Sequence, residues 1–292
     1  MYARVDRLKE FAESLAARAA YVIWTDRLRA AGGPLRGARS TASGLIIPAA
    51  LAAERLMREL LALHRPGDAV LSEQPPTPGR ITWVLDPLNG TTNYLYGLPS
   101  YAVSIAAQLD DVVLAGAVAE PHSQRIWSAG LGQGARLHDR NISRDWLEIR
   151  VGSTQHLDDA LISTGFSPVA ATSADQADLV ARLRPHVADL RITGSPALQL
   201  CHVAAGWSDA YVQHDVGLRE RVAGLLIADE AGAFVHSPGR TGPGSQLGDP
   251  VIAAAPRISD ALLEVLAQSG AAAVRRAAHD QQLPAVLPGR TA

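Results

Sequence analysis

The chain has 292 residues, of which 47% are hydrophobic and 19% charged, as expected for a globular protein with one large domain or two tightly joined ones. A formal net charge of −2 argues against nucleic acid as the main partner, and the single cysteine, Cys201, excludes an intrachain disulfide. No run of about 18 to 20 apolar residues predicts a membrane span, and the N-terminus lacks the pattern of a signal peptide, so we expect a cytoplasmic protein with no membrane partner.

Helices and a sheet are predicted for the first half of the chain. Apolar residues recur at helical spacing over 5–31 and again over 49–63. A short strand is expected in 68–74, and "ITWVLD", residues 81–86, is a second, apolar strand that ends in Asp86. Residues 101–137 alternate apolar strands with tight turns, which is typical of a sheet meander.

From about residue 150, helices and strands alternate along the chain. A helix is followed by a strand in each of three stretches, over 178–192, 195–212 and 219–237. A terminal helix follows over 258–270. This order predicts an α/β fold in which layers of helix and sheet stack on one another. We expect an N-terminal half over 1–150, a C-terminal half over 151–270 and a frayed, Ala-, Arg- and Pro-rich tail over 271–292.

Three acids stand at the ends of predicted strands or at the start of a helix. Glu73 ends one strand, Asp86 ends the next, and Glu220 opens the helix "RERVAGLLIADEAG". Mg²⁺ prefers hard oxygen ligands and often binds one or two carboxylates together with substrate phosphate. If these acids meet the carbonyl of Leu88 at a helix N-terminus, which favours anions, the result is a site for a metal and a phosphate. Glu73 alone or Glu220 alone is better explained as a solvated turn residue or a helix cap, so the prediction rests on the three acids as a set.

Three segments in order carry a family resemblance. "WVLDPLNGTTNYLYG" (83–97), "RITGSPALQLCHVAAGWSDAYV" (191–212) and "RVAGLLIADEAGA" (221–233) resemble the inositol monophosphatases and related metal-dependent, lithium-sensitive phosphatases. The resemblance covers roughly residues 5 to 265. It implies the layered fold of that family, a Mg²⁺ cofactor, a small phosphorylated substrate and a homodimer.

The family's site residues can be placed on this sequence one by one. The metal ligands fall on Glu73, Asp86, the carbonyl of Leu88, Asn89 and Glu220, with Asp215 as a rival to Glu220. Thr91 and Gly90 match residues that touch the nucleophilic water and the phosphate, so Thr91, Glu73 and Asp86 are the catalytic candidates. Gly194 and Ser195 match the substrate region, Gln213 stands where inositol-specific members have a glutamate, and His214 follows at the expected rim.

Several positions depart from the family pattern. Asn89 replaces an aspartate and removes a negative charge, while Glu220 is one methylene longer than the expected aspartate. Ile47 and Ala50 replace a threonine and the aspartate implied to orient the attacking water, so this wall of the substrate site is apolar. We therefore expect a weakened magnesium site that holds one ion or none.

Three functions are compatible with these residues. The first is a Mg²⁺-dependent phosphomonoester hydrolase of reduced or altered activity. The second is a repurposed catalyst, such as a cyclase or isomerase in a specialised biosynthetic pathway, that uses the same pocket without full metal binding. The third is a non-catalytic pseudoenzyme, and only an assay with the true substrate separates it from the second.

Overall fold

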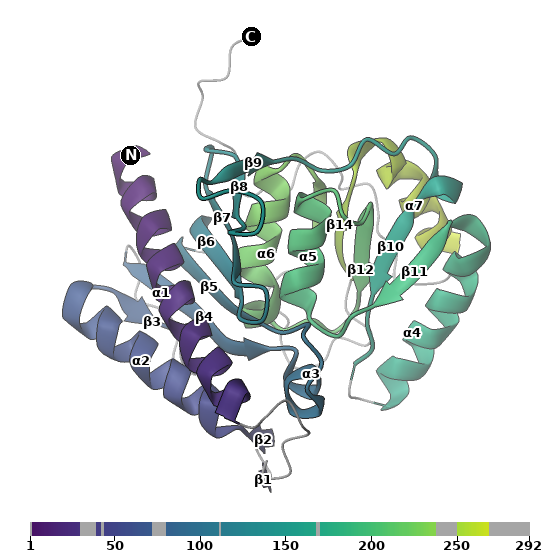
Figure 1. The fold of residues 1–292 in the computed structure, drawn as a ribbon. Helices are drawn as coiled ribbons and strands as arrows, with labels where there is room; N and C mark the ends of the chain where they lie inside the picture. Colours follow the sequence, from purple (N-terminus) through teal and green to yellow (C-terminus); the bar gives the residue numbers. More distant parts are fainter. Residues whose placement is uncertain are drawn as a thin grey trace.

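The first half of the chain is built on a seven-stranded sheet (Figure 1). The computed structural model describes residues 2–29, 39–41, 44–71, 80–110, 112–167, 170–237 and 250–268. The strand order is β3-β4-β5-β6-β7-β8-β9, and every neighbouring pair is antiparallel except β3 and β4. The strands are β3 (Ala69–Val70), β4 (Ile81–Asn89), β5 (Ala102–Leu109), β6 (Val112–Glu120), β7 (Arg125–Gly130), β8 (Ala135–His138) and β9 (Leu147–Ile149).

Helices cover both faces of this sheet. The helices α1 (Tyr2–Arg29) and α2 (Pro48–His64) pack on one face, and α5 (Pro196–Ala204) and α6 (Leu218–Glu230) pack on the other (Figure 1). Each pairing buries its own apolar cluster, because the sheet strands carry apolar residues on both sides. The short helix α3 (Thr91–Tyr96) follows β4 directly, and a two-stranded ribbon, β1 (Arg39–Thr41) with β2 (Gly44–Ile46), precedes α2.

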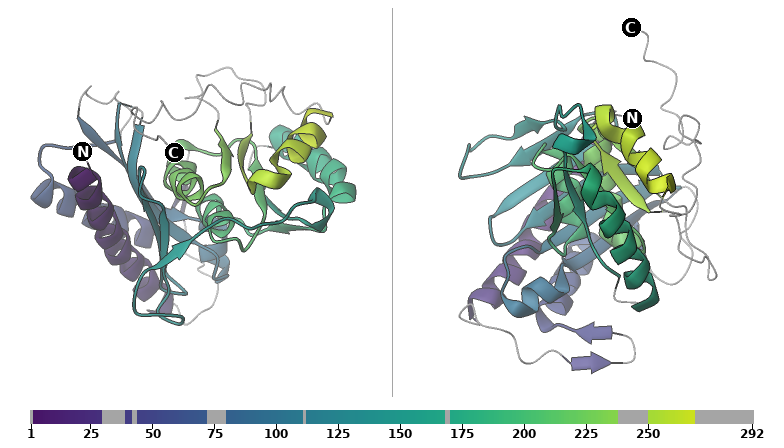
Figure 2. Two further views of the ribbon diagram at one scale, coloured as in Figure 1. Left: turned by 90° about the horizontal axis from the view of Figure 1, so that it is seen from above. Right: turned by 90° about the vertical axis from the view of Figure 1, so that its right-hand side faces the viewer.

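A second sheet of five strands forms the other half, in the order β11-β10-β12-β14-β13. Its elements are the 3₁₀ helix η1 (Leu157–Asp159), β10 (Leu161–Thr164), α4 (Ala170–Leu183), the 3₁₀ helix η2 (Arg184–His186), β11 (Asp189–Ile192), β12 (Ala210–Gln213), β13 (Phe234–His236), β14 (Val251–Ala254) and α7 (Pro256–Gln268). The helices α5 and α6 lie between the two sheets, and α4 and α7 cover the outer face of the second one (Figure 2). The layers therefore run helix, sheet, helix, sheet, helix.

The predicted fold class is confirmed, with two local differences. The helices expected over 5–31 and 49–63 are α1 and α2, and the meander is β5 to β8. The strand expected in 68–74 is described only as the two residues of β3. The prediction that the next strand ends at Asp86 is wrong, because β4 continues through a register shift to Asn89.

The expected division near residue 150 falls between the two sheets. The helices α5 and α6 of the second half nevertheless share one buried cluster with strands of the first. The division into separate domains therefore remains a prediction, and the tail over 271–292 lies outside the described residues.

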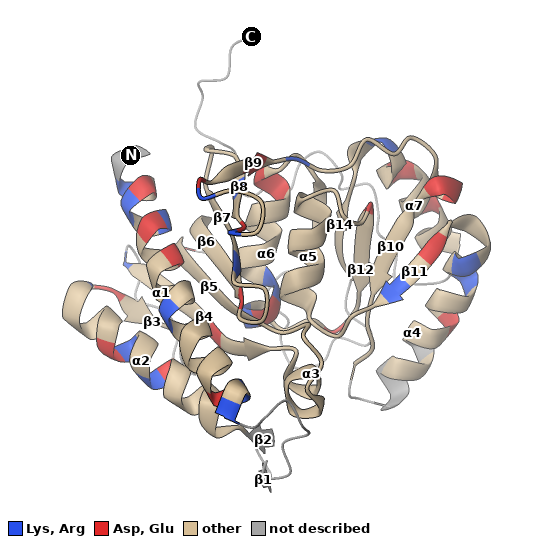
Figure 3. Cartoon of the chain, in the orientation of Figure 1, with Lys and Arg blue, Asp and Glu red and all other residues tan. Residues whose placement is uncertain are grey.

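Charged side chains are distributed according to the layers. They lie along the outer helices, at both ends of α6 and on parts of the strands and loops (Figure 3). The sequence of α5, which lies between the sheets, contains none. In the described part of the chain, every helix is too short or too polar to span a bilayer.

Candidate active site

The candidate site is built around the end of β4. The register between β4 and β5 shifts between Asp86 and Asn89, which inserts one extra residue into β4. Asp86 Oδ1 accepts a hydrogen bond from the backbone N–H of Leu88 at 3.3 Å, and Thr91 Oγ1 donates to the Leu88 carbonyl at 3.2 Å. Gly90 closes the turn at φ 85°, where a Cβ atom would stand 2.8 Å from the Ser100 carbonyl oxygen. The bulge and the turn thus link Asp86, Leu88 and Thr91 to one another by hydrogen bonds.

Asn89 connects this turn to the start of α5. Its side chain is buried, and its Oδ1 atom accepts from Ser195 Oγ at 2.7 Å and from the Ala197 backbone N–H at 3.1 Å. Its Nδ2 atom donates to Asp86 Oδ2 at 3.0 Å. Asn89 therefore satisfies one of the free N–H groups at the N-terminus of α5 and bonds a candidate metal ligand at the same time.

Glu220 reaches the same region from the first turn of α6. Its Oε2 atom accepts from the Gly217 backbone N–H at 2.7 Å, which is the glutamate half of a capping box, because the N-cap glycine has no side chain to supply the other half. Burial raises the pKa of Glu220, and the negative charges of Asp86 and Asp215 raise it further. Burial also raises the pKa of Asp86, while the hydrogen bond from Asn89 and the positive charge of Arg219 partly oppose this rise. The charge of Asp86 thus disfavours the ionised form of Glu220, whereas the raised pKa of Asp86 itself comes from burial.

Such a pair fits a divalent cation, which would offset the repulsion between the two charges. Within the described residues, no three His, Cys, Asp or Glu side chains gather closely enough to hold a metal. Glu73, the third acid expected from the sequence, lies outside the described residues. The described donors suited to a metal are accordingly the carboxylates of Asp86 and Glu220, with the Leu88 carbonyl beside them.

The residues predicted to form the apolar wall and to contact substrate differ in how deeply they are buried. Ile47 caps α2 and is buried in the same apolar cluster as Leu88, and Ala50 is half-buried against that cluster. Gly194 is exposed, whereas Ser195 is fully buried. Ser195 thus contacts Asn89 directly, whereas Ile47 and Ala50 share an apolar cluster with Leu88, and the roles of all these residues toward substrate stay predictions.

The residues after β12 are engaged with the protein itself. Gln213 is buried, and its Oε1 atom accepts from the Tyr211 hydroxyl at 2.9 Å. His214 is buried, and its backbone carbonyl accepts from Gln176 Nε2 at 2.9 Å. Asp215 is exposed in a left-handed conformation with φ 58°, and it accepts from Ser167 Oγ. Glu220 is thus the half-buried acid of this region, and Asp215 lies toward solvent.

Asn93 is a site residue that the sequence analysis missed. Its Nδ2 atom donates to the carbonyls of Ser100 and Thr193, each at 2.6 Å, and so ties α3 to the segment that leads into α5. It lies inside the motif "NGTTNY", but the motif alone does not show which segment far along the chain it contacts.

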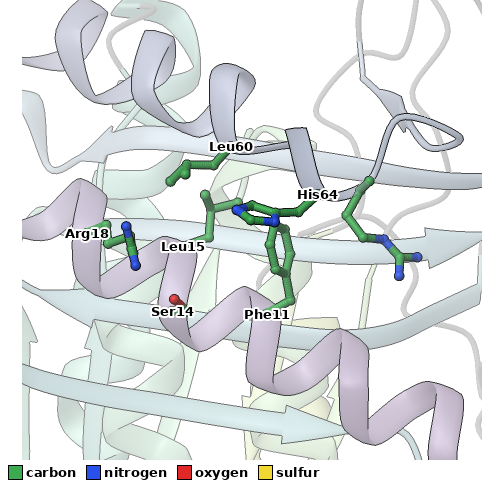
Figure 4. Close-up of a pocket in the computed structure, with 7 residues that line it drawn as sticks. Phe11, Ser14, Leu15, Arg18, Leu60 and His64 are labelled. Carbon is green, nitrogen blue, oxygen red and sulfur yellow. The ribbon is translucent and has the colours of Figure 1, made fainter. Parts of the chain in front are cut away.

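A cavity of about 320 Å³ lies away from these residues, between α1 and α2. Phe11, Leu15 and Leu60 line it together with Ser14, Arg18, His64 and Arg65, and Figure 4 shows the His64 ring next to Phe11. Phe11 packs on Trp83, near the start of β4. Asp86 lies further along that strand, Glu220 lies on α6, and neither lines this cavity, so it is separate from the candidate site.

Comparison with known proteins decides the relationship. A sequence profile of the inositol monophosphatase family matches residues 4–275. The chain belongs to the inositol monophosphatase family. The inositol-1-monophosphatase of Mycobacterium leprae (strain TN) is 44% identical over 276 residues, which cover 89% of this chain and 94% of the relative.

Two further relatives are informative. The solved structure of Mycobacterium tuberculosis SuhB superposes with a TM-score of 0.75 at 40% identity, covering 91% of this chain and 98% of that one. A protein named Nus factor SuhB, from Escherichia coli (strain K12), is 33% identical over 219 residues, which cover 73% of this chain and 78% of the relative. The resemblance inferred from the three motifs is confirmed, and with it an inositol monophosphatase-like protein of a family that generally depends on Mg²⁺.

Proposed function

We propose that this member of the inositol monophosphatase family is a Mg²⁺-dependent phosphomonoester hydrolase that acts on a small phosphorylated metabolite. The observation that carries the proposal is the pair of half-buried carboxylates, Asp86 and Glu220, in which the charge of Asp86 raises the pKa of Glu220; a divalent cation would relieve this repulsion. The N-terminus of α6 stands beside them, and a helix start favours a bound anion such as phosphate.

The chain's own residues divide the work as follows. Asp86, Glu220 and the Leu88 carbonyl would hold the cation, and Glu73 is proposed as a further ligand. Thr91 Oγ1 uses its proton on the Leu88 carbonyl, so its oxygen lone pairs remain to accept a hydrogen bond from the attacking water. The bound Mg²⁺ supplies Lewis acidity toward a phosphate oxygen. Gly90 lets the backbone approach that phosphate closely, because it carries no Cβ atom.

The proposed rate is lower than that of relatives with a complete acid set. Ala50 carries a methyl group that cannot accept a proton, and assistance from a general base typically contributes a factor of about 10² to 10⁴. Asn89 brings no charge to offset the dehydration of a second ion. Retained but slow hydrolysis follows from these two substitutions.

Phosphate release from a panel of small phosphate esters, inositol phosphates included, tests the proposal. Hydrolysis by the wild type should disappear with EDTA, return with Mg²⁺, and fall to background in Asp86→Ala. Asp260→Ala is the matched control, because Asp260 is exposed on α7, on the outer face of the second sheet, and its loss should leave the rate unchanged. Failure of every ester to turn over above the Asp86→Ala background would refute the hydrolase.

Two alternatives remain as hypotheses. A cyclase or isomerase would use the apolar wall at Ile47 and Ala50 and would turn over a substrate without releasing phosphate. A non-catalytic binding role is favoured by the name of the Escherichia coli relative, Nus factor SuhB, and predicts complex formation without turnover. A homodimer, a small-molecule partner and the absence of a nucleic-acid partner are proposed on the resemblance and on the net charge of −2.

A further inference from the structure

The side chain of Asn89 has no capacity left to bind a metal ion. An amide oxygen has two lone pairs, and Ser195 Oγ and the Ala197 N–H occupy both of them on Oδ1. The orientation of the amide is fixed, because a backbone N–H can only donate and therefore requires the oxygen to face α5. The nitrogen must then face Asp86, where a carboxylate oxygen accepts.

An aspartate at position 89 would change one of these contacts and keep the others. One of its oxygens would still accept from Ser195 and Ala197, as Asn89 Oδ1 does. The other would take the place of Nδ2, which stands 3.0 Å from Asp86 Oδ2. Two carboxylate oxygens at such a separation repel unless a proton or a cation lies between them. An aspartate here needs a cation at this point, whereas Asn89 supplies an N–H.

From this geometry we propose that Asn89 replaces a second metal ion. Its amide N–H donates to Asp86 at the point where a protein with an aspartate at position 89 would need a second cation. Its amide oxygen accepts from Ser195 and Ala197 and so holds the start of α5 in place. The site is therefore organised without metal and takes up one Mg²⁺, at Asp86 and Glu220. This inference rests on the proposed function for the identity of that single ion. The hydrogen bonds that connect Asp86 through Asn89 to α5, called the bridge below, do not depend on the proposed function.

The test compares metal-free full-length proteins by thermal unfolding and by calorimetric titration with Mg²⁺. The wild type should bind one Mg²⁺ per chain. Asn89→Asp should unfold roughly 5 to 15 °C lower in EDTA, because it buries an uncompensated charge, and Mg²⁺ should restore its stability while the stoichiometry rises to two.

Asn93→Asp is the matched control. Asn93 is also a buried asparagine of the same turn, but its Nδ2 atom donates to two backbone carbonyls and to no carboxylate. This variant should lose stability in EDTA without recovery in Mg²⁺. The exchanged pair Asp86→Asn/Asn89→Asp reverses the polarity of the hydrogen bond, so it should unfold well above Asn89→Asp in EDTA. It also keeps the test decisive if Asn89→Asp does not fold.

Several outcomes would overturn the inference. The wild type could bind two Mg²⁺ ions, or Asn89→Asp could be as stable as the wild type in EDTA. Mg²⁺ could rescue Asn93→Asp as well as it rescues Asn89→Asp, or the exchanged pair could be no more stable than Asn89→Asp. A wild type that binds no Mg²⁺ and hydrolyses no ester would refute the proposed function instead. In that case a loss of stability in metal-free Asn89→Asp, regained by the exchanged pair, still supports the bridge.

Discussion

At the scale of single residues, Glu220 has two roles that conflict in the metal-free protein. As an acceptor from Gly217 it stabilises the start of α6. As a half-buried anion near Asp86 and Asp215 it is destabilising, and its pKa rises for that reason. A glutamine keeps the acceptor and removes the charge, so it separates the two roles.

We predict that Glu220→Gln stabilises the metal-free protein at neutral pH. The pKa of Glu220 is raised in the folded state above its ordinary value of 4.5. Between pH 4.5 and the folded-state pKa, the folded protein therefore binds more protons than the unfolded one, so the stability of the wild type falls as pH rises through this window. Below 4.5 both states are protonated, and the two proteins should be about equally stable. Above the folded pKa, only the wild type carries the buried charge.

Urea unfolding in EDTA at pH 4 and at pH 7.5 checks this prediction. The free energy of unfolding of the variant should exceed that of the wild type at pH 7.5 only. Excess Mg²⁺ should reverse the order, because the cation binds the wild-type carboxylate. A variant that is less stable than the wild type at pH 7.5 in EDTA would show that the charge of Glu220 helps the fold.

The difference between what sequence reveals and what it conceals is clearest at Asn89. The sequence shows that an amide stands where relatives have an acid, and from that alone Asn89 is predicted to be a weak metal ligand. Two of its three hydrogen-bond partners lie 106 and 108 residues further along the chain. Hydrogen bonds to Ser195 and Ala197 depend on how α5 is docked, which no local pattern encodes. Asp86 and Glu220 could be proposed from the sequence because each lies within a family motif, and their role as metal ligands stays a prediction.

At the scale of elements, the position of Glu220 depends on the packing of α6 against α5. Gly224 lies in the buried face of α6, where an added Cβ atom would stand 2.8 Å from Cβ and 2.9 Å from Cδ1 of Leu200 on α5. The Leu200 Cβ atom is fixed to the backbone, so rotation of the side chain cannot relieve the contact. The sequence "RERVAGLLIADEAG" predicts a helix, but it does not predict this close crossing.

Gly224→Ala should therefore destabilise the protein by about 1 to 3 kcal/mol, the usual cost of overpacking. An alanine favours a helix by about 1 kcal/mol over glycine, so any net loss must come from the contact with α5. Urea unfolding measures the difference. Gly67→Ala is the control, because an added Cβ atom there meets nothing within 4 Å. A Gly224→Ala protein as stable as the wild type would mean that α5 and α6 separate easily.

At the scale of the whole molecule, the site joins two halves that share one core. Asp86 and Asn89 belong to the first sheet, whereas Ser195 and Glu220 belong to helices of the second half. Those helices form one buried cluster with strands of the first sheet, and separate clusters lie under α1 and α2 and under α4 and α7. Either half alone would expose one side of the central cluster to water, so neither half should be stable alone.

We predict that the two halves unfold in one transition. Leu262→Ala, in the outer cluster under α7, should lower the unfolding free energy by roughly 2 to 5 kcal/mol. The loss should be the same when it is measured at β5 in the first sheet and at β12 in the second. Leu8→Ala, in the cluster under α1, is the reciprocal variant and should weaken β12 as much as β5. Hydrogen exchange of β5 and β12 amides, followed through low concentrations of denaturant, reports both free energies in one experiment. If each variant weakened only its own sheet, the halves would be independent domains, and the bonds from Asn89 to α5 would then open separately from the rest of the fold.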